Sequence, residues 1–378
     1  MKYSTLFEPM TLLPGLVVRN RIVMAPMTTW AGNDDGTVSD EEEAYYRRRA
    51  QDVGLVIIGC THVQENGVGF TGEFAAHDDR YIPSLRKLAR AAKSGGAPAI
   101  LQIFHAGVKT LPALVTDVVA ASAVAGDGGP FASAIMPRAL DGEEIPDIVE
   151  AFADATRRAI MAGFDGVELH GAHGFLIQNF FSPRSNRRTD EWGGSLENRM
   201  RFPLAIVAAV RRTIAEHADR PFALGYRISV EEEVQGGLTL DDSLQLITRL
   251  IDAGASYIHA SLGSALDQQP STGEHRGTIV SILRAHIDGR VPLMAAGRVK
   301  TPAQAASALD MGLALVAVGQ GLVIDPEWVS HARAGRDADV RTTISADDVA
   351  RTSIPGKLWG VINATPGWFE VVAPDSAA

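Results

Sequence analysis

Cysteine is almost missing from this chain of 378 residues, since Cys60 is its single example. One cysteine cannot form a disulfide within the chain, and it cannot ligate an iron–sulfur cluster by itself. Positive charge is also in short supply, with 35 Lys and Arg against 45 Asp and Glu. The resulting net charge of −10 disfavours nucleic acid and anionic membranes as partners, because both require a basic surface.

Long apolar runs are absent as well. The first twenty residues are interrupted by Pro9, Pro14 and Gly15 before the apolar core of a secretory signal could form. No stretch approaches the roughly 20 apolar residues that a transmembrane helix needs. We therefore expect a cytoplasmic protein with a small-molecule substrate and no membrane partner.

Eight short apolar runs recur along the chain, and each is followed by a segment with helical character. They cover residues 21–27, 54–60, 98–105, 164–170, 222–229, 256–261, 291–297 and 313–319. Apolar strands that alternate with helices are typical of a parallel sheet covered by helices. Eight such units predict an α/β fold, a (β/α)8 TIM barrel, in which residues 1–378 form a single domain.

Three segments exceed the barrel repeat. The chain opens with a hairpin-like segment, residues 107–145 follow the third strand, and a C-terminal tail runs from about residue 338. The stretch 107–145 is too long for a plain connection, so it predicts a lid or a rim. The tail either reaches a neighbouring subunit of a homo-oligomer or covers its own barrel.

The ends of one helix are marked in the sequence. Thr301 is a favourable N-cap residue, Pro302 suits the first helical position, and Gly312 suits the position just past the end. The helix is therefore predicted between Thr301 and Gly312.

The active site of a (β/α)8 barrel lies at the carboxyl ends of its strands. Here those ends carry polar side chains but no cluster of carboxylates. A histidine metal site normally adds a carboxylate or a third imidazole, so we expect no catalytic metal. The pair His170 and His173 could still serve in proton transfer, in holding a substrate oxygen, or in packing.

The last two strands each end in a glycine followed by a predicted helix. Gly297 with Arg298 and Gly319 with Gln320 occupy these positions. Barrels of this fold commonly bind phosphate there through backbone N–H groups. A tight turn is the alternative explanation for the glycines.

Six motifs, in order and spacing, resemble the old yellow enzyme family of FMN-dependent NAD(P)H oxidoreductases over roughly residues 4–335. The longest is highly specific. The motifs are RNRIVMAPMTT, ILQIFHAGVK, ELHGAHGFLIQNFFSPRSNRRTDEWGGSLENRMRF, LGYRIS, AAGRV and VAVGQGLVIDPEW.

The resemblance implies a two-step reaction in which NAD(P)H passes a hydride to flavin N5, and the flavin passes it to an activated alkene. By position, His170 and His173 would hold the substrate oxygen, and Thr28 would bond the flavin C4 oxygen. Two N–H donors aimed at one oxygen would stabilise the negative charge that develops as hydride adds.

Further residues are assigned by the same resemblance. Arg227 would lie beside the flavin N1 and C2 oxygen, and the Gln102 amide would form hydrogen bonds with the pyrimidine edge of the flavin. The other residues expected at the flavin are Ala25, Pro26, Met27, Cys60, Gly297, Arg298, Gly319 and Gln320, while Trp30, Lys109 and Phe175 would border the substrate pocket.

Three positions depart from the family pattern. Phe175 replaces a tyrosine that usually donates a proton to the product, Gln320 replaces an arginine at the FMN phosphate, and Val108 occupies a position that is often basic. Tyr226 is a poor substitute donor, because Arg227 must face inward and strand alternation turns Tyr226 outward. A quinone, nitro-compound or flavin reductase is therefore an alternative, and a flavin-free barrel that binds a phosphorylated ligand is a remote one.

Overall fold

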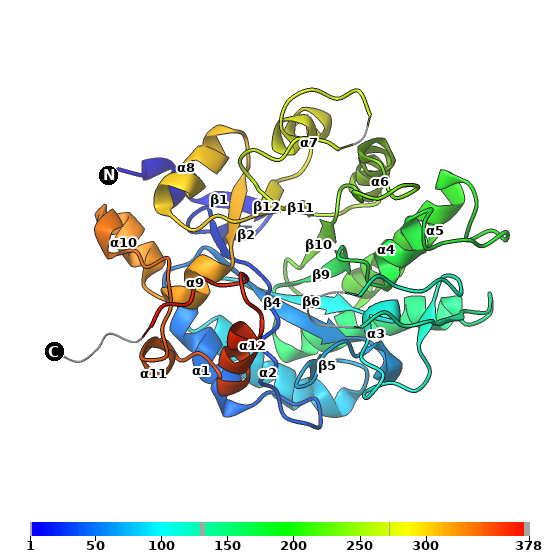
Figure 1. Cartoon of the computed structure of the whole chain (residues 1–378), viewed down its shortest axis with the longest axis horizontal. Coiled ribbons are helices and arrows are strands. Elements are labelled where there is room, and N and C mark those ends of the chain that lie inside the picture. Colours follow the sequence, from blue (N-terminus) through cyan, green and yellow to red (C-terminus); the bar gives the residue numbers. More distant parts are fainter. Residues whose placement is uncertain (1, 129–132, 272, 374–378) are drawn as a thin grey trace.

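Eight parallel strands form a closed barrel with helices around it (Figure 1). The structure is a computed structural model, and it describes residues 2–128, 133–271 and 273–373. Hydrogen bonds run from strand to strand in chain order, and the pairing of the first with the last closes the ring. The barrel strands are β3 (Ile22–Met24), β4 (Leu55–His62), β6 (Ala99–Phe104), β9 (Gly166–Gly171), β10 (Ala223–Ile228), β11 (Tyr257–Ser261), β12 (Leu293–Ala296) and β13 (Leu315–Val318). All eight predicted strands and the predicted fold are confirmed.

The barrel strands are apolar on both faces because one face fills the interior and the other packs against helices. All eight residues of β4, for example, are buried. The helices are α1 (Asp40–Arg49), α2 (Ile82–Ala92), α3 (Ile145–Ala162), α4 (Leu176–Phe181), α5 (Leu196–His217), α6 (Leu240–Asp252), α7 (Ile279–Ile287), α8 (Pro302–Asp310), α9 (Gln320–Ile324), α10 (Trp328–Ala334), α11 (Asp348–Thr352) and α12 (Gly356–Ala364).

Helix α8 has the ends that the sequence predicts. The Thr301 side chain accepts from the Gln304 N–H, and the Gln304 side chain accepts from the Thr301 N–H, which makes a capping box. Gly312 follows the helix with a φ of 107°, a left-handed conformation that glycine adopts without strain.

The N-terminal hairpin supplies part of the barrel interior. Strands β1 (Met10–Leu13) and β2 (Leu16–Val18) pair antiparallel. Their Leu12 and Val18 side chains are buried in one cluster with interior residues of the barrel such as Leu55. The predicted hairpin therefore contributes to the core.

The stretch after β6 contains little regular structure. Residues 129–132 of this stretch lie outside the described residues. The described part holds a short 3-10 helix, η4 (Gly107–Lys109), and a parallel pair, β7 (Val119–Ala120) with β8 (Arg138–Ala139). A further short strand, β5 (Phe74–Ala75), pairs with the end of β4.

The C-terminal tail packs on its own barrel. Helix α12 lies near α1 (Figure 1), and the Gly356 N–H donates to Glu41 of α1 over 3.3 Å. Ile344 and Val371 form an isolated bridge that returns the chain end to the start of the tail. No helix in the described part of the chain has the length and apolar character of a membrane span.

Candidate active site

A cavity of about 430 Å³ opens at the carboxyl ends of the strands, and most of the predicted site residues line it. Strand order and direction bring them together, although they are distant in sequence. Its lining consists of Pro26, Met27, Thr28, Trp30, Cys60, Phe70, Gln102, Lys109, His170, His173, Phe175, Arg227 and Trp368.

His170 lies near the end of β9 and is 2% exposed. Its Nδ1 accepts from the Ala172 N–H over 3.3 Å, which leaves the proton of a neutral ring on Nε2. Burial lowers the pKa of His170 well below the ordinary value, and the nearby His173 and Arg227 add to this effect. The ring is therefore a neutral N–H donor at pH 7.

His173 lies in the loop after β9 in a left-handed conformation, with a φ of 62°. Its backbone N–H donates to the Ser229 hydroxyl, and its Nε2 lies 2.7 Å from the Ser261 hydroxyl. Ser261 in turn accepts from Arg227 over 3.1 Å. Because Ser261 accepts from Arg227, its hydroxyl can donate a hydrogen bond to Nε2 of His173. We therefore assign the proton of the His173 ring to Nδ1, the nitrogen that has no hydrogen bond with the described residues. Non-glycine residues in this conformation are strained and cluster at functional sites.

Phe175 occupies the position two residues beyond His173. Its ring packs edge-on against His170, with centroids 4.7 Å apart, and against Phe104 at 4.8 Å. It therefore supports the orientation of the His170 ring, and it has no proton to donate.

An aromatic wall covers one side of the cavity. Trp30 contacts Phe70 and Trp368 edge-on, with centroid distances of 5.7 Å and 5.9 Å. Phe70 continues the wall toward Phe175 at 6.3 Å. Such a wall excludes water and favours a planar, largely apolar ligand.

Buried polar side chains lie beneath the cavity. The Glu168 carboxylate accepts from Gln102 over 2.7 Å, from the Tyr257 hydroxyl over 3.0 Å and from His259 Nδ1 over 3.0 Å. Burial alone would raise the pKa of Glu168, but His259, Arg227 and the hydrogen bonds hold it below the ordinary value. Glu168 is therefore an anion, and as an acceptor it fixes the Gln102 amide with its nitrogen toward the carboxylate.

Cys60 is a buried structural thiol. Its Sγ lies 3.7 Å from the Gln102 side-chain oxygen, and burial raises its pKa, so it stays protonated. Arg227 has one hydrogen-bond donor that is not used, because its Nε is buried and has no hydrogen-bond partner within the described residues.

Five predicted residues lie outside this cavity lining. Ala25 is buried with the interior cluster, and its backbone N–H extends the ladder to Val318. A Cβ at Gly297 would lie 2.5 Å from the Ala265 nitrogen, and one at Gly319 would lie 3.0 Å from the Met27 sulfur. Both glycines therefore permit close packing, which neither the phosphate interpretation nor the tight-turn interpretation had predicted.

The two polar side chains that follow these glycines, Gln320 and Arg298, have different surroundings. The Gln320 side chain donates to the backbone oxygen of Trp368, so it holds the tail. Arg298 has a φ of 53°, is exposed, and has no hydrogen bond or ion pair with the described residues. The register between β12 and β13 ends at Ala296 and Ala317, two residues before Arg298 and Gly319 in each chain segment.

Sequence reasoning missed Phe70, Trp368, Tyr257 and His259. Phe70 and Trp368 come from a loop and from the tail, and no strand-end rule points to them. Tyr257 and His259 alternate on one strand, β11, and this spacing could have identified them as facing the interior. Within the described ranges, no group of three or more His, Cys, Asp or Glu side chains could hold a metal ion.

Known proteins resemble this chain in sequence and in fold. The NADH:flavin oxidoreductase / NADH oxidase family matches residues 5–339. The chain is 42% identical to a probable NADH-dependent flavin oxidoreductase of Bacillus subtilis, over 97% of this chain and 98% of that one. It is 40% identical to the NADH:fumarate oxidoreductase of Klebsiella pneumoniae, over 94% of this chain and 38% of that longer protein.

Solved structures have a similar fold. The old yellow enzyme homologue from Zymomonas mobilis matches with a TM-score of 0.77 and 26% identity, over 92% of this chain and 96% of that one. The chain therefore belongs to the NADH:flavin oxidoreductase / NADH oxidase family and is an FMN-dependent NAD(P)H oxidoreductase of the old yellow enzyme type.

Proposed function

We propose that this enzyme reduces activated alkenes, such as α,β-unsaturated carbonyl or nitro compounds, whose oxygen is held by His170 and His173. Bound FMN supplies the hydride relay between NAD(P)H and this second substrate. The protein's own residues position the cofactor, hold the substrate oxygen and exclude water.

The residues of the cavity fit FMN. The buried Nε of Arg227 lacks a partner in the described chain and would donate to an oxygen or nitrogen of the flavin ring. Gln102 has a second amide hydrogen beyond the one given to Glu168, and Thr28 offers a hydroxyl. Arg298, which is exposed and unpaired in the described chain, would meet the phosphate in place of the arginine that Gln320 replaces.

The observation that carries the proposal is the pair of neutral imidazoles. Their ring centroids lie 4.9 Å apart, and each has one N–H free of bonds to the described residues. Two neutral donors at one oxygen stabilise the charge that appears there during the reaction, and removing one such donor typically costs about 10²–10³ in kcat.

One longer relative, of which this chain covers 38%, is named for chemistry of the same kind. Fumarate, the substrate in the name of the Klebsiella protein, has a C=C bond conjugated to carboxylates. Such a bond is activated toward hydride because an oxygen accepts the charge, which is the task proposed for the histidine pair.

Phe175 favours a second candidate, reduction of quinones or nitro compounds or of free flavin. Reduction of a quinone places protons on oxygen, which solvent can supply, and needs no side-chain acid at carbon. The absence of a donor at Phe175 would therefore limit enone reduction more than quinone reduction.

The test uses the purified holoenzyme under anaerobic conditions. NADH or NADPH should bleach the flavin absorbance, and 2-cyclohexenone should restore it. In His170→Ala we expect the rate of reoxidation by the enone to fall by about 10²-fold or more. The control His286→Ala changes a histidine on α7, outside the cavity, and should leave the rate unchanged. An undiminished rate in His170→Ala would contradict the proposal.

A further inference from the structure

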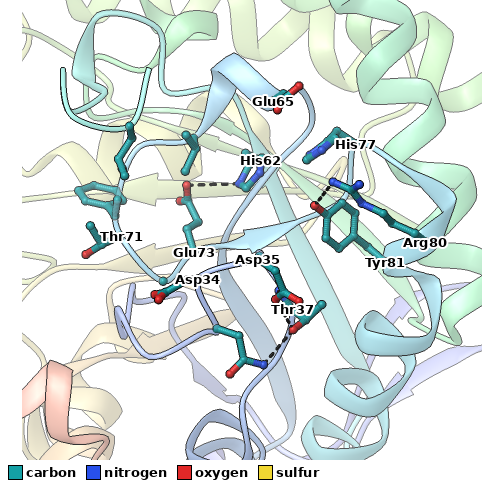
Figure 2. A pocket seen from close by; sticks show the side chains of 16 residues that line it. Asp34, Asp35, Thr37, His62, Glu65, Thr71, Glu73, His77, Arg80 and Tyr81 are labelled. Carbon is teal, nitrogen blue, oxygen red and sulfur yellow. Dashed lines mark hydrogen bonds and ion pairs between the residues drawn. The ribbon is translucent and has the colours of Figure 1, made fainter. Parts of the chain in front are cut away.

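A second cavity, of about 640 Å³, lies beside the active site (Figure 2). It is lined by residues 33–37 before α1, by residues from His62 at the end of β4 to Tyr81, and by Leu114 from the stretch after β6. Phe70 lines both cavities, so the two share a wall at the same end of the barrel. The reaction proposed above leaves this cavity without a role.

The exposed part of the cavity is acidic. Asp34, Asp35 and Glu65 are exposed at its lining, whereas Glu73 lies deeper and fully buried, where burial raises the pKa of its carboxyl well above the ordinary value and favours the neutral form. Arg80 is the single lysine or arginine among the described residues that line it, and it donates to the Tyr81 hydroxyl. Lys357, outside the lining, lies 3.7 Å from the Asp34 carboxylate and offsets part of its charge. Burial keeps the pKa of His62 low, so this histidine adds no positive charge. The cavity therefore disfavours a phosphate group inside it and favours the neutral, hydroxylated part of a ligand.

Two buried polar groups at the cavity lack partners. His62 Nδ1 and the Glu73 carboxyl face each other at 3.6 Å, as Figure 2 shows, and this distance is too long for a hydrogen bond. Neither His62 Nδ1 nor Glu73 Oε1 has a hydrogen-bond partner in the described part of the chain. Such groups are costly to leave unsatisfied, so ligand hydroxyls that reach them would bind favourably.

Aromatic surface completes the lining. His77 stacks on His62 with ring centroids 5.2 Å apart, and Tyr81 packs against His77 at 4.9 Å. Phe70 adds a third ring on the side of the active site. Rings of this kind suit a flat heterocycle, because stacking depends on the π-face and not on a particular substituent.

We propose that this cavity receives the adenosine end of NADH and makes the enzyme prefer NADH to NADPH. The inference rests on the proposed function, because it requires the nicotinamide in the adjacent active-site cavity. Carboxylates accept hydrogen bonds from the ribose hydroxyls, as they do in dinucleotide-binding sites, and they repel the 2′-phosphate of NADPH. Glu65 is the best placed, since it has no hydrogen bond or ion pair with the described residues.

Binding of the adenosine fragment tests this assignment without any hydride transfer. Calorimetry on the holoenzyme would compare ADP-ribose with 2′-phospho-ADP-ribose. We expect ADP-ribose to bind about tenfold more tightly or better, since one acidic side chain at the ribose discriminates by this order. Equal affinity, or no binding of ADP-ribose, would overturn the proposal.

Variants connect the preference to this cavity. In Glu65→Gln with Asp34→Asn, we expect the ratio of NADPH to NADH dissociation constants in anaerobic flavin reduction to fall at least about threefold, since two charges are removed. Glu143→Gln removes an exposed carboxylate before α3 and should leave the ratio unchanged. An unchanged ratio in the double variant would overturn the cavity assignment. Bound ADP-ribose with reduced flavin that no enone reoxidises would support the cavity and contradict the proposed function.

Discussion

Phe175 is the residue at which this chain departs most clearly from the expected chemistry. Its phenyl ring holds the His170 ring by an edge-on contact, and it lines the cavity where a tyrosine would present a hydroxyl. Tyr226 is buried in the outer core with the helix-facing residues, as strand alternation predicts, and does not line the cavity. Neither residue can therefore protonate carbon in the cavity, which leaves solvent or an unassigned group as the donor, or an acceptor that needs no proton at carbon.

Phe175→Tyr should increase enone reduction about tenfold or more, because a positioned acid typically contributes 10²–10⁴-fold. The measurement is the rate of flavin reoxidation by 2-cyclohexenone, with a quinone as the comparison substrate. Phe175→Leu is the control, since it retains an apolar side chain but offers no proton. If tyrosine brings no gain over phenylalanine, protonation at carbon does not limit the reaction.

Glu168 provides the negative charge beneath the site. Three side chains donate to it, and Arg227 lies close enough to lower its pKa. In Glu168→Gln the field around the flavin becomes more positive, so we expect its reduction potential to rise by on the order of tens of millivolts. Redox titration of the bound flavin would measure this shift. An unchanged potential would show that Glu168 acts by packing alone, and a fall in potential would contradict the electrostatic assignment.

Helix α1 holds the loop that bears Trp30. The buried Glu42 accepts from the Thr29 hydroxyl and from the Ala31 N–H, on either side of Trp30, which has a left-handed φ of 55°. Burial raises the pKa of Glu42 from 4.5 to about 7. The folded protein therefore binds a proton here that the unfolded chain has already lost.

This difference makes stability depend on pH. A carboxyl with a raised pKa in the folded state stabilises it fully below pH 4.5, and this contribution is lost as the pH rises to about 7. We expect the free energy of unfolding to fall by up to roughly 3 kcal/mol over this window, because each unit of difference between the folded and unfolded pKa corresponds to about 1.36 kcal/mol.

Urea unfolding of the wild type and of Glu42→Gln between pH 4.5 and 7.5 would measure this contribution. Glu42→Gln should remove this part of the pH dependence, whereas Glu197→Gln, which changes an exposed carboxylate on α5, should retain it. Parallel curves for wild type and Glu42→Gln would refute the assignment.

At the scale of the whole molecule, the C-terminal tail completes the active-site cavity. Trp368 contacts Trp30 and is held through its backbone oxygen by Gln320, which follows the last barrel strand. The tail thus closes over its own barrel, one of the two arrangements that the sequence left open.

Trp368→Ala should open the cavity to solvent. We expect iodide to quench the fluorescence of the bound flavin more strongly, by about twofold or more, because a large ring that excludes water is removed. Val372→Ala changes an exposed apolar side chain of the same tail and serves as the control. Equal quenching in Trp368→Ala and wild type would mean that the tryptophan does not shield the flavin.

Much of the fold followed from local pattern. Apolar runs such as 54–60 are readable because a strand buried on both faces must be apolar throughout, and the caps of α8 are readable because they satisfy backbone groups within four residues. The fold then located the site, since strand ends in a parallel barrel converge, and His170, Arg227 and Gln102 indeed line one cavity.

The sequence by itself therefore determined the eight strands, the helix ends and the residues at the strand ends, because each depends on spacing within one element. Only the tertiary structure decided that Trp368 completes the cavity, that Gln320 binds the tail, and that Glu73 and His62 meet in a second cavity. These are contacts between segments far apart in the chain. Their distances depend on how the loops pack, and no local pattern of residues encodes that packing.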